Sequence, residues 1–525
     1  MHVFTVSLWY LKGIATALVL SSTIGSSAVA QSVETIGDET LAAVDQAFSD
    51  TVLDTGAPGL IYGVVLRDGT VETNAFGARD LETRAEIDGD TAFRIASMTK
   101  MLTALLVLDL QDQGFLSLDD PAEDYVPALK DWEYPTTDSR KVQVRDLLMH
   151  TSGFIWDDPW ADRQMARTQD EIDEFLNQAK PFSNVPGTEY EYSNLGYAIL
   201  GQIIQNITGK SYADVLKQRI FDPLGMTRST LEYSDLPKAN RAVGYNLIAG
   251  EYVIEPVLAS GTFDPLGGVW TTANDYTKLM TWMLGAWPAR DGPETGAIPR
   301  RVVRALGETA VIRAPVRPLG RDGGSGCLMS RGYGMGVVVQ YHCQAGPVLG
   351  HGGGFPGYGS HVLLAPEKGI AVFAFANETY ARSRFATWDA MSALLKAGIG
   401  TSKQHLPPAP EMLGVYENIG AAFEAGTLDT GALSFADNFL LDQDMDRWNR
   451  QLAEMNETAG TCDVSAPLKH DGRLSGAFEW TCERGRVAGY MTVSPLDAGA
   501  LQNLQMRVRT RDRSGRDLVI DYDWH

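Results

Sequence analysis

The sequence Ile-Ala-Ser-Met-Thr-Lys-Met-Leu-Thr-Ala-Leu-Leu-Val-Leu occupies residues 95–108. Its apolar residues recur at the spacing of a helix face, and Gly114 follows them, so we predict a helix that starts near Ser97 and ends near Gly114. Ser97 and Lys100 are three positions apart and therefore lie on the same face of that helix. The stretch thus places an amine beside a hydroxyl.

A serine next to a lysine is a candidate nucleophile. A serine alcohol is weak at neutral pH and needs a base to take its proton. A lysine serves as that base where burial or a neighbouring cation lowers its pKa. The N–H groups at the start of a helix can also stabilise a developing oxyanion. An isolated Ser-x-x-Lys is more often a solvated first turn, but the apolar neighbours of Ser97 favour a packed site.

A second motif is Tyr192-Ser193-Asn194. A phenol close to a lysine cation can act as a base or an acid, and an asparagine amide can orient the lysine or a substrate carbonyl. A similar Tyr-x-Asn at residues 416–418 lies beyond the expected catalytic domain, and we interpret it as structural.

The third motif is His351-Gly352-Gly353-Gly354. Such a run lets a substrate backbone approach a strand edge and find N–H donors there, although a plain flexible turn is the alternative. Esterases of the α/β-hydrolase fold carry a similar run, but they need a G-x-S-x-G elbow that this sequence lacks. We therefore reject that fold.

Taken together and in this order, the motifs resemble the serine β-lactamase and penicillin-binding-protein superfamily, and in particular its class C branch. The resemblance covers roughly residues 38–400. It also includes the Leu-Leu-Met-His-Thr-Ser-Gly turn at 147–153, Pro186-Gly187 and Gly267-Gly268.

The resemblance implies an α/β (α+β) fold in which an antiparallel sheet is flanked by helices and joined by an all-helical lobe. It implies that Ser97 is the nucleophile, Lys100 its partner and Tyr192 the general base. Asn194 would touch Lys100 and the substrate. The backbone N–H groups of Ser97 and Gly354 would form the oxyanion hole, and His351 and Gly353 would line the substrate site.

The same strand departs from the β-lactamase pattern, because His351-Gly352-Gly353 stands where those enzymes carry Lys-Thr-Gly. Losing charge-assisted hydrogen bonds of roughly 1.5–3 kcal/mol each weakens the recognition of a substrate carboxylate. We therefore expect an ester, or an amide or peptide of a D-amino acid, as the substrate. The alternatives are a DD-carboxypeptidase or penicillin-binding protein, a class C β-lactamase, and a non-catalytic relative that binds the cell wall.

The net charge of the chain indicates which kinds of molecule it binds. A net charge of -22 over 525 residues argues against nucleic acid, which needs basic patches. We expect a small-molecule or peptide substrate, no metal and no cofactor, and the sequence does not predict an oligomeric state.

Residues 1–30 are typical of a signal peptide, with Lys12, a short apolar run and Ala28-Val29-Ala30 as a cleavage site. We therefore expect a periplasmic or secreted protein with no stable membrane span after cleavage. That compartment favours two local disulfides, Cys327 with Cys343 and Cys462 with Cys482, over a zinc site or free thiols.

The domain prediction is a hydrolase domain at 31–403, a Pro-rich linker at 404–410 and a small α+β accessory domain at 411–525. Within the first domain we predict a hairpin at 60–80, two helices at 196–226, strands at 362–364 and 370–375, and a helix at 382–396. In the second we predict a helix at 440–455, followed by strands near 462, 478–482 and 491–494.

Overall fold

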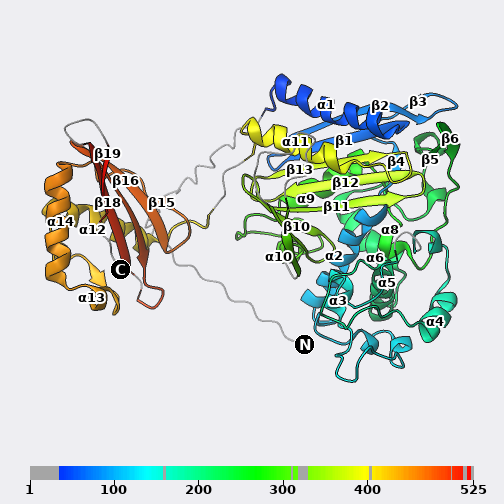
Figure 1. Cartoon of the computed structure of the whole chain (residues 1–525), viewed down its shortest axis with the longest axis horizontal. Coiled ribbons are helices and arrows are strands. Elements are labelled where there is room, and N and C mark those ends of the chain that lie inside the picture. The colour runs from blue at the N-terminus through cyan, green and yellow to red at the C-terminus, as the bar shows by residue number, and fades with distance from the viewer. Residues whose placement is uncertain are drawn as a thin grey trace, which may run out of the picture. The chain divides into compact units, whose positions relative to one another are not determined.

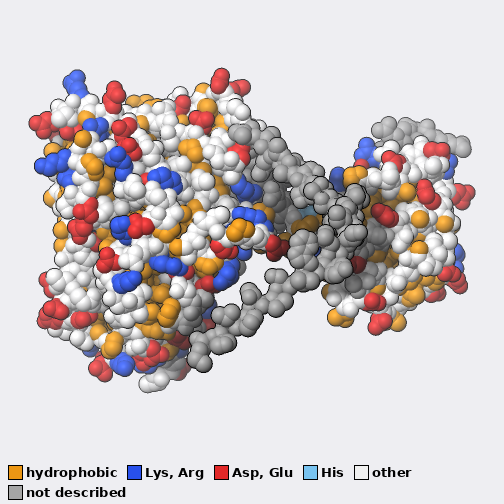
Figure 2. Space-filling view, turned by 180° about the vertical axis from the view of Figure 1, so that it is seen from behind, with side chains coloured by type: hydrophobic (Ala, Val, Ile, Leu, Met, Phe, Trp, Pro, Cys, Tyr) orange, Lys and Arg blue, Asp and Glu red, His pale blue; other side chains and the backbone are white. Residues whose placement is uncertain are grey.

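The computed structural model describes residues 35–157, 161–308, 311–316, 329–400, 405–497, 499–511 and 517–521 (Figure 1). The predicted signal peptide lies outside these residues. Acidic and basic side chains are interspersed over the face shown in Figure 2. No helix of the described part is long and apolar enough to cross a membrane.

Among the described residues from 59 to 376, nine strands form one sheet in the order β3-β2-β1-β13-β12-β11-β10-β9-β8, with every pair antiparallel. The strands are β1 Gly59–Leu66, β2 Val71–Asp80, β3 Ala85–Glu86, β8 Val311–Val316, β9 Met329–Tyr333, β10 Val338–His342, β11 Gly346–Phe355, β12 Tyr358–Ala365 and β13 Ile370–Ala376. The predicted hairpin at 60–80 and the predicted strand pair at 362–375 are confirmed.

The central strands are buried on both faces, which explains their almost continuous apolar sequences. In β13, Ile370, Val372 and Ala374 point into one hydrophobic cluster, while Ala371, Phe373 and Phe375 point into another. Successive side chains of a strand alternate between faces, so one strand contributes to two cores.

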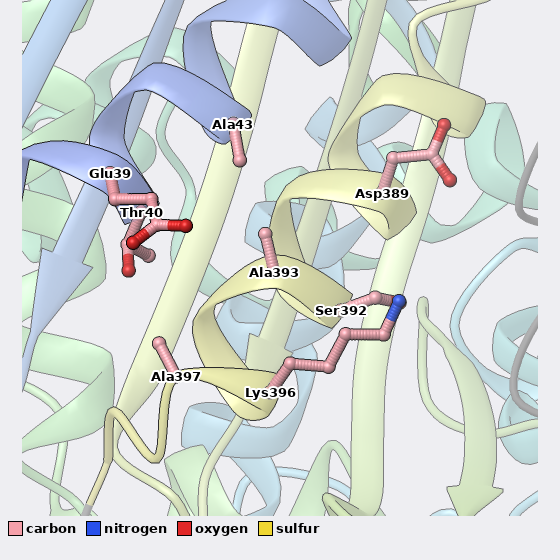
Figure 3. A pocket seen from close by; sticks show the side chains of 8 residues that line it. All are labelled: Glu39, Thr40, Ala43, Asp389, Ser392, Ala393, Lys396 and Ala397. Atoms are coloured by element: carbon pink, nitrogen blue, oxygen red, sulfur yellow. The ribbon is translucent and has the colours of Figure 1, made fainter.

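Two helices cover the first face of the sheet, α1 Asp38–Thr55 and α11 Arg384–Lys396 (Figure 1). Phe48 of α1 and Trp388 of α11 pack with the alternate residues of β1 and β13. Short side chains, including Ala43 and Ala393, face an open groove of about 550 Å³ between the two helices (Figure 3). The predicted helix at 382–396 is confirmed.

The second face carries the helical lobe. Its helices are α2 Thr99–Asp112, α3 Val144–Met149, α4 Gln169–Gln178, α5 Asn194–Thr208, α6 Tyr212–Leu216, α7 Asp222–Leu224, α8 Asp264–Gly267, α9 Ala273–Leu284 and α10 Arg300–Ala305. Two small sheets join it, β4 Ala92–Arg94 with β7 Trp270–Thr272 and β5 Tyr245–Ile248 with β6 Glu251–Ile254. α2 is buried from Thr99 to Leu110, as expected for a helix that is apolar all round. The predicted fold class and the helices at 196–226 are confirmed.

Residues beyond 405 contain a mixed sheet in the order β14-β18-β17-β16-β15, with β19 paired to β18. Its strands are β14 Ser434–Phe435, β15 Lys469–His470, β16 Ser475–Cys482, β17 Gly485–Val493, β18 Ala500–Arg511 and β19 Asp517–Asp521. The helices are α12 Pro410–Ala425, α13 Phe439–Asp442 and α14 Met445–Ala459. A hydrophobic cluster drawn from residues 409–508, including Trp448 and Trp480, packs these elements together.

The sequence prediction for this part was incomplete. The predicted helix at 440–455 corresponds to α13 and α14, and the predicted strands at 478–482 and 491–494 lie in β16 and at the end of β17. α12 was missed, and Pro410, assigned to the linker, is its first residue. Proline is favoured at that position, because the first helical residue needs no N–H partner. Tyr416 lies in α12 and its hydroxyl bonds Ala466 and Trp480, a structural role.

The cysteines are oxidised where they are described. Cys462 and Cys482 form a disulfide with an S–S distance of 2.00 Å. Cys343 is also disulfide-bonded, and its expected partner Cys327 lies outside the described residues.

Candidate active site

Ser97 lies on a sharp elbow between β4 and α2. The short 3₁₀ turn Ala96–Met98 makes this elbow, and Ala96 has a φ of 50° in the left-handed region. That conformation strains a residue with a side chain, and it persists where the surroundings enforce it. Here Ile95 donates its N–H to Val269 O at 2.9 Å and accepts the Ser360 hydroxyl at 2.8 Å.

Lys100 lies one helical turn after Ser97 and is fully buried. Its ammonium donates to Ser97 Oγ at 3.1 Å, Asn194 Oδ1 at 2.6 Å and the carbonyl oxygen of Leu266 at 2.8 Å. These three acceptors use all three protons of the ammonium. The nitrogen is therefore held at a fixed distance from the hydroxyl.

Tyr192 reaches the same hydroxyl from the segment before α5. Its phenol donates to Ser97 Oγ at 3.0 Å, and Lys100 Nζ lies 5.1 Å from the centre of its ring. The ring of Tyr192 also contacts the ring of His150, with centroids 4.3 Å apart. The structure thus brings together Ser97, Lys100, Tyr192 and Asn194 from two separate parts of the chain.

The turn at 193–195 is held by Asp157, which the sequence motifs did not include, and by His150 of the motif at 147–153. Asp157 accepts the N–H groups of Asn194 at 2.6 Å and Leu195 at 2.8 Å, and the hydroxyl of Ser193 at 3.2 Å. His150 Nδ1 accepts the N–H of Ser193 at 3.1 Å. Burial and the neighbouring Lys100 keep the pKa of His150 well below its usual value, so the ring is neutral and can accept this bond.

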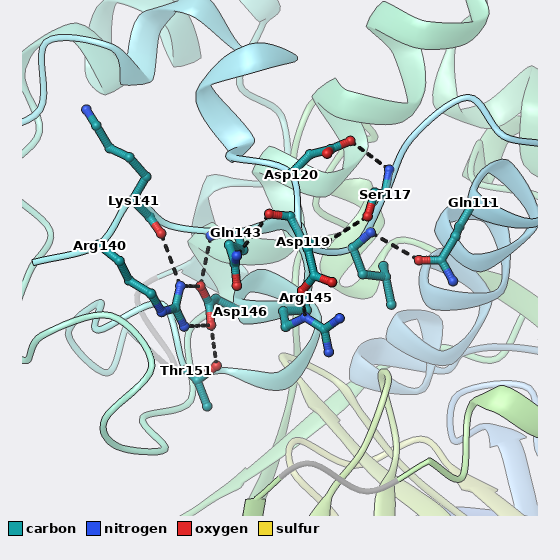
Figure 4. A network of polar contacts seen from close by, with 11 residues as sticks. Gln111, Ser117, Asp119, Asp120, Arg140, Lys141, Gln143, Arg145, Asp146 and Thr151 are labelled. Atoms are coloured by element: carbon teal, nitrogen blue, oxygen red, sulfur yellow. Dashed lines mark hydrogen bonds and ion pairs between the residues drawn. The ribbon is translucent and has the colours of Figure 1, made fainter.

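His150 is itself fixed by a polar network around α3 (Figure 4). The residue ends α3 with a φ of 56°. Buried Asp146 binds Arg140 in a bidentate ion pair at 2.5 and 2.7 Å, caps the helix through the N–H of Gln143 at 2.8 Å, and accepts the Thr151 hydroxyl at 2.9 Å. The carboxylate therefore connects both ends of α3 and holds the turn that presents His150.

β11 contributes His351, Gly352 and Gly354 to the lining of the same site. His351 lies 2.6 Å from the Gly352 carbonyl through Nδ1 and 2.9 Å from the Tyr333 hydroxyl through Nε2. A carbonyl only accepts, so Nδ1 carries the proton and Nε2 accepts from Tyr333. Burial lowers the pKa of His351 to about 3, so the ring is neutral at physiological pH.

The glycines of β11 allow the strand to touch the elbow. A Cβ on Gly353 would lie 2.2 Å from Ser360 Oγ and 2.3 Å from the Ile95 carbonyl oxygen, and a Cβ on Gly354 would lie 2.3 Å from the ring of Tyr380. At Gly352 the nearest atom would be 3.5 Å away, which is ordinary contact. Gly353 and Gly354 are therefore required by packing, while Gly352 is not.

A pocket of about 520 Å³ opens above these groups. Ser97, Tyr192, His351 and Gly354 contribute to its lining, together with Trp156, Arg331 and Tyr380, which the sequence motifs did not single out. Among the described residues, no group of three or more His, Cys, Asp or Glu side chains is arranged to hold a metal ion. The groups that face the pocket near Ser97 suit acyl transfer.

This fold, with a buried lysine and a tyrosine bonded to one serine hydroxyl, defines a serine hydrolase of the β-lactamase and penicillin-binding-protein class. The chain belongs to the β-lactamase family, because the family model described as "Beta-lactamase" matches residues 42–396. The predicted resemblance over roughly 38–400 is confirmed.

Curated relatives agree with this assignment. The chain is 30% identical over 391 residues to "Penicillin-binding protein 4" of Amycolatopsis lactamdurans, which covers 70% of this chain and 94% of that protein. It is 31% identical over 252 residues to "Beta-lactamase-like protein 2" of Dictyostelium discoideum, covering 47% of this chain and 46% of that protein. The chain thus spans less than half of the second relative.

Solved structures share the fold. A penicillin-binding protein homologue from Pyrococcus abyssi, described as octameric, superposes with a TM-score of 0.56 at 21% identity and covers 91% of this chain and 95% of that chain. A class C β-lactamase gives a TM-score of 0.55 at 21% identity and covers 68% of this chain and 96% of that chain.

Proposed function

We propose that this protein is an exported serine hydrolase in which Ser97 is acylated by an ester or by an amide or peptide of a D-amino acid. The observation that carries the proposal is the pair of hydrogen bonds to Ser97 Oγ, from Lys100 Nζ at 3.1 Å and from the Tyr192 hydroxyl at 3.0 Å.

In the proposed reaction, Ser97 Oγ attacks the substrate carbonyl carbon. Tyr192 acts as a phenolate: its own proton passes to solvent, and the ammonium of Lys100 beside it stabilises the negative charge. The phenolate accepts the serine proton and passes it to the leaving oxygen or nitrogen as that bond breaks. The N–H groups of Ser97 and Gly354 stabilise the oxyanion. Water then attacks the acyl-enzyme along the reverse path, releases the acid and returns the proton to Ser97.

The chemistry of β11 supports a substrate that carries no charged group beside its reacting carbonyl. His351 is neutral and both of its nitrogens are engaged by protein groups, and Gly352 has no side chain. Trp156, which is 58% exposed, adds an apolar surface to the pocket lining. These features suit a neutral or aromatic substituent better than a carboxylate.

The direct test is labelling with a fluorophosphonate, followed by peptide mapping and an activity panel. We expect the label on Ser97, and we expect hydrolysis of a nitrophenyl ester or a D-amino-acid amide to exceed that of a penicillin. Ser97→Ala is expected to lose both label and turnover. Full turnover by this variant would refute the assignment, and an unlabelled wild type would favour a non-catalytic wall-binding protein.

A second candidate, a DD-carboxypeptidase, is favoured by one specific observation. Arg331, on β9, lines the pocket together with Ser97 and lies near His351. A guanidinium suits a terminal carboxylate, which it can bind through two parallel hydrogen bonds.

Turnover of a D-alanyl-D-alanine peptide and of a nitrophenyl ester distinguishes the carboxypeptidase from the esterase. If Arg331 binds a carboxylate, Arg331→Gln should reduce turnover of a D-alanyl-D-alanine peptide at least tenfold more than turnover of a nitrophenyl ester. Arg331→Lys serves as the matched variant, since it keeps the charge but loses the bidentate geometry. An equal effect on both substrates would exclude the carboxypeptidase assignment.

Export is proposed from the segment at 1–30 and from the oxidised cysteines, because disulfides persist in oxidising compartments. Fractionation of cells that express the whole chain tests this. Recovery from the periplasm or medium, with an N-terminus near residue 31, is the expected result.

A further inference from the structure

Asp157 is a partly buried carboxylate next to the proposed catalytic groups, and the reaction described above gives it no role. It lies after α3 in the sequence, and its carboxylate accepts three hydrogen bonds from one turn at the start of α5. Oδ1 accepts the N–H of Asn194 at 2.6 Å, and Oδ2 accepts the N–H of Leu195 at 2.8 Å and the hydroxyl of Ser193 at 3.2 Å.

These contacts matter because of the residues on either side of the turn. The first N–H groups of a helix have no partner within the helix, and a carboxylate placed there satisfies two of them and opposes the positive end of the helix dipole. Tyr192 precedes the turn and Asn194 is part of it. The turn therefore determines where the phenol meets Ser97 Oγ and where the amide oxygen meets Lys100 Nζ.

The charge of Asp157 also acts on Lys100. The three hydrogen-bond acceptors described for the Lys100 ammonium are neutral. One of them is the side chain of Asn194, and the carboxylate of Asp157 accepts the backbone N–H of that same residue. Burial raises the pKa of Asp157, while its N–H donors and the charge of Lys100 oppose that rise. The amide of Asn194 thus connects a carboxylate at its backbone to an ammonium at its side chain.

We infer that Asp157 is a positioning residue of the proposed hydrolase, which fixes Tyr192 and Asn194 against Ser97 and Lys100 and places a negative charge behind the lysine. The inference rests on the proposed function. It distinguishes Asp157 from an ordinary helix cap, because a cap stabilises a helix without changing the rate at an intact site.

The test is Asp157→Asn in the full chain, assayed with a nitrophenyl ester and normalised by fluorophosphonate titration of active sites. The asparagine amide has only one acceptor oxygen, so its NH₂ group faces a backbone N–H that the carboxylate of Asp157 accepts. The substitution also removes the negative charge of Asp157. A shift of the reacting groups by a fraction of an ångström lowers a rate by roughly 10–100-fold, and we expect that loss in kcat with less than a threefold change in KM. The pH–rate profile should also move to lower pH, because the site has lost a negative charge.

Two further variants complete the design. Asp157→Ser retains a hydrogen-bond acceptor without the charge and serves if the asparagine variant is poorly folded; it should recover thermal stability but not kcat. Asp444→Asn is the matched control, since Asp444 accepts the N–H of Arg447 at 2.8 Å at the start of α14, a helix whose apolar residues belong to the separate hydrophobic cluster beyond residue 405. It should lower stability and leave kcat unchanged.

The outcomes separate the inference from the proposed function. If the wild type is labelled at Ser97 and Asp157→Asn keeps the wild-type kcat per active site, Asp157 is a structural residue and the inference is wrong. The inference is also wrong if the variant has fewer active sites that react with the fluorophosphonate but each of them turns over at the wild-type rate. A wild type that takes no label at Ser97 overturns the proposed function instead.

Discussion

Gly353→Ala is the substitution for which the structure gives the clearest expected cost. The added methyl group would lie 2.2 Å from Ser360 Oγ and 2.3 Å from the Ile95 carbonyl oxygen, whereas Cβ atoms essentially never approach another atom closer than 3.0 Å. β11 and the elbow that bears Ser97 must therefore separate by roughly 1 Å, and a displacement of that size costs about 10²-fold in rate. This corresponds to about 2.7 kcal/mol of transition-state stabilisation.

The same substitution should also lower the stability of the protein. It disrupts the hydrogen bond from Ser360 to Ile95, and the overpacked contact costs about 1–3 kcal/mol of folding free energy. Steady-state hydrolysis of a nitrophenyl ester, with active-site titration and thermal melts on the same samples, separates the two effects. We expect kcat/KM to fall about 100-fold per active site.

Gly352→Ala is the matched control one residue away. Its methyl group would meet no atom closer than 3.5 Å, so we expect near-normal activity and stability. If Gly353→Ala and Gly352→Ala behave alike, the contact between β11 and the elbow does not position Ser97 as we argue.

Tyr192→Phe should lower kcat by roughly 10²–10⁴-fold with little change in stability, because the ring keeps its contact with His150 while one hydroxyl is lost; activity within threefold of wild type would contradict its role as base. Asp264→Asn should change the pH dependence of thermal stability. Burial raises the pKa of Asp264 to about 7, so the folded protein holds this proton more tightly than the unfolded chain, and the resulting stabilisation is complete below about pH 4 and is lost as pH rises through 7. The variant should show a flatter decline over that interval, and an unchanged slope would show that another group titrates. Replacing both Cys462 and Cys482 by alanine should destabilise the part beyond residue 405 by about 3 kcal/mol, from a loop with a sequence separation of 20, and should leave the labelling of Ser97 intact; parallel loss of label in a protein with a native melt would contradict this.

The sequence predicts which side chains meet around Ser97, because its motifs are short and local. Ser97 and Lys100 are one helical turn apart, and Asp68-Gly69 after the apolar run at 60–66 is a turn signal for a hairpin. The order of the motifs along the chain then predicts the family and its fold.

The supporting groups could not be predicted in the same way. Asp157 and Asn194 are 37 positions apart and share no motif, and Arg331 enters the pocket from a strand that the sequence analysis did not identify. The burial of His351 could not be predicted from the sequence either. A histidine usually has a pKa near 6.5, whereas burial lowers the pKa of His351 to about 3. α12 was missed because Pro407, Pro408 and Pro410 indicated a linker, although a proline such as Pro410 can begin a helix.

The pairing of β1 with β13 affects how this chain is made. Leu66 pairs with Ile370, so one edge of the N-terminal hairpin finds its partner about 300 residues later in the sequence. At 5–20 residues per second, synthesis leaves that apolar edge unpaired for about 15–60 seconds. An unpaired strand edge can pair with the wrong partner, so the long interval between the synthesis of β1 and its pairing with β13 exposes the nascent chain to a misassembly that the finished sheet avoids.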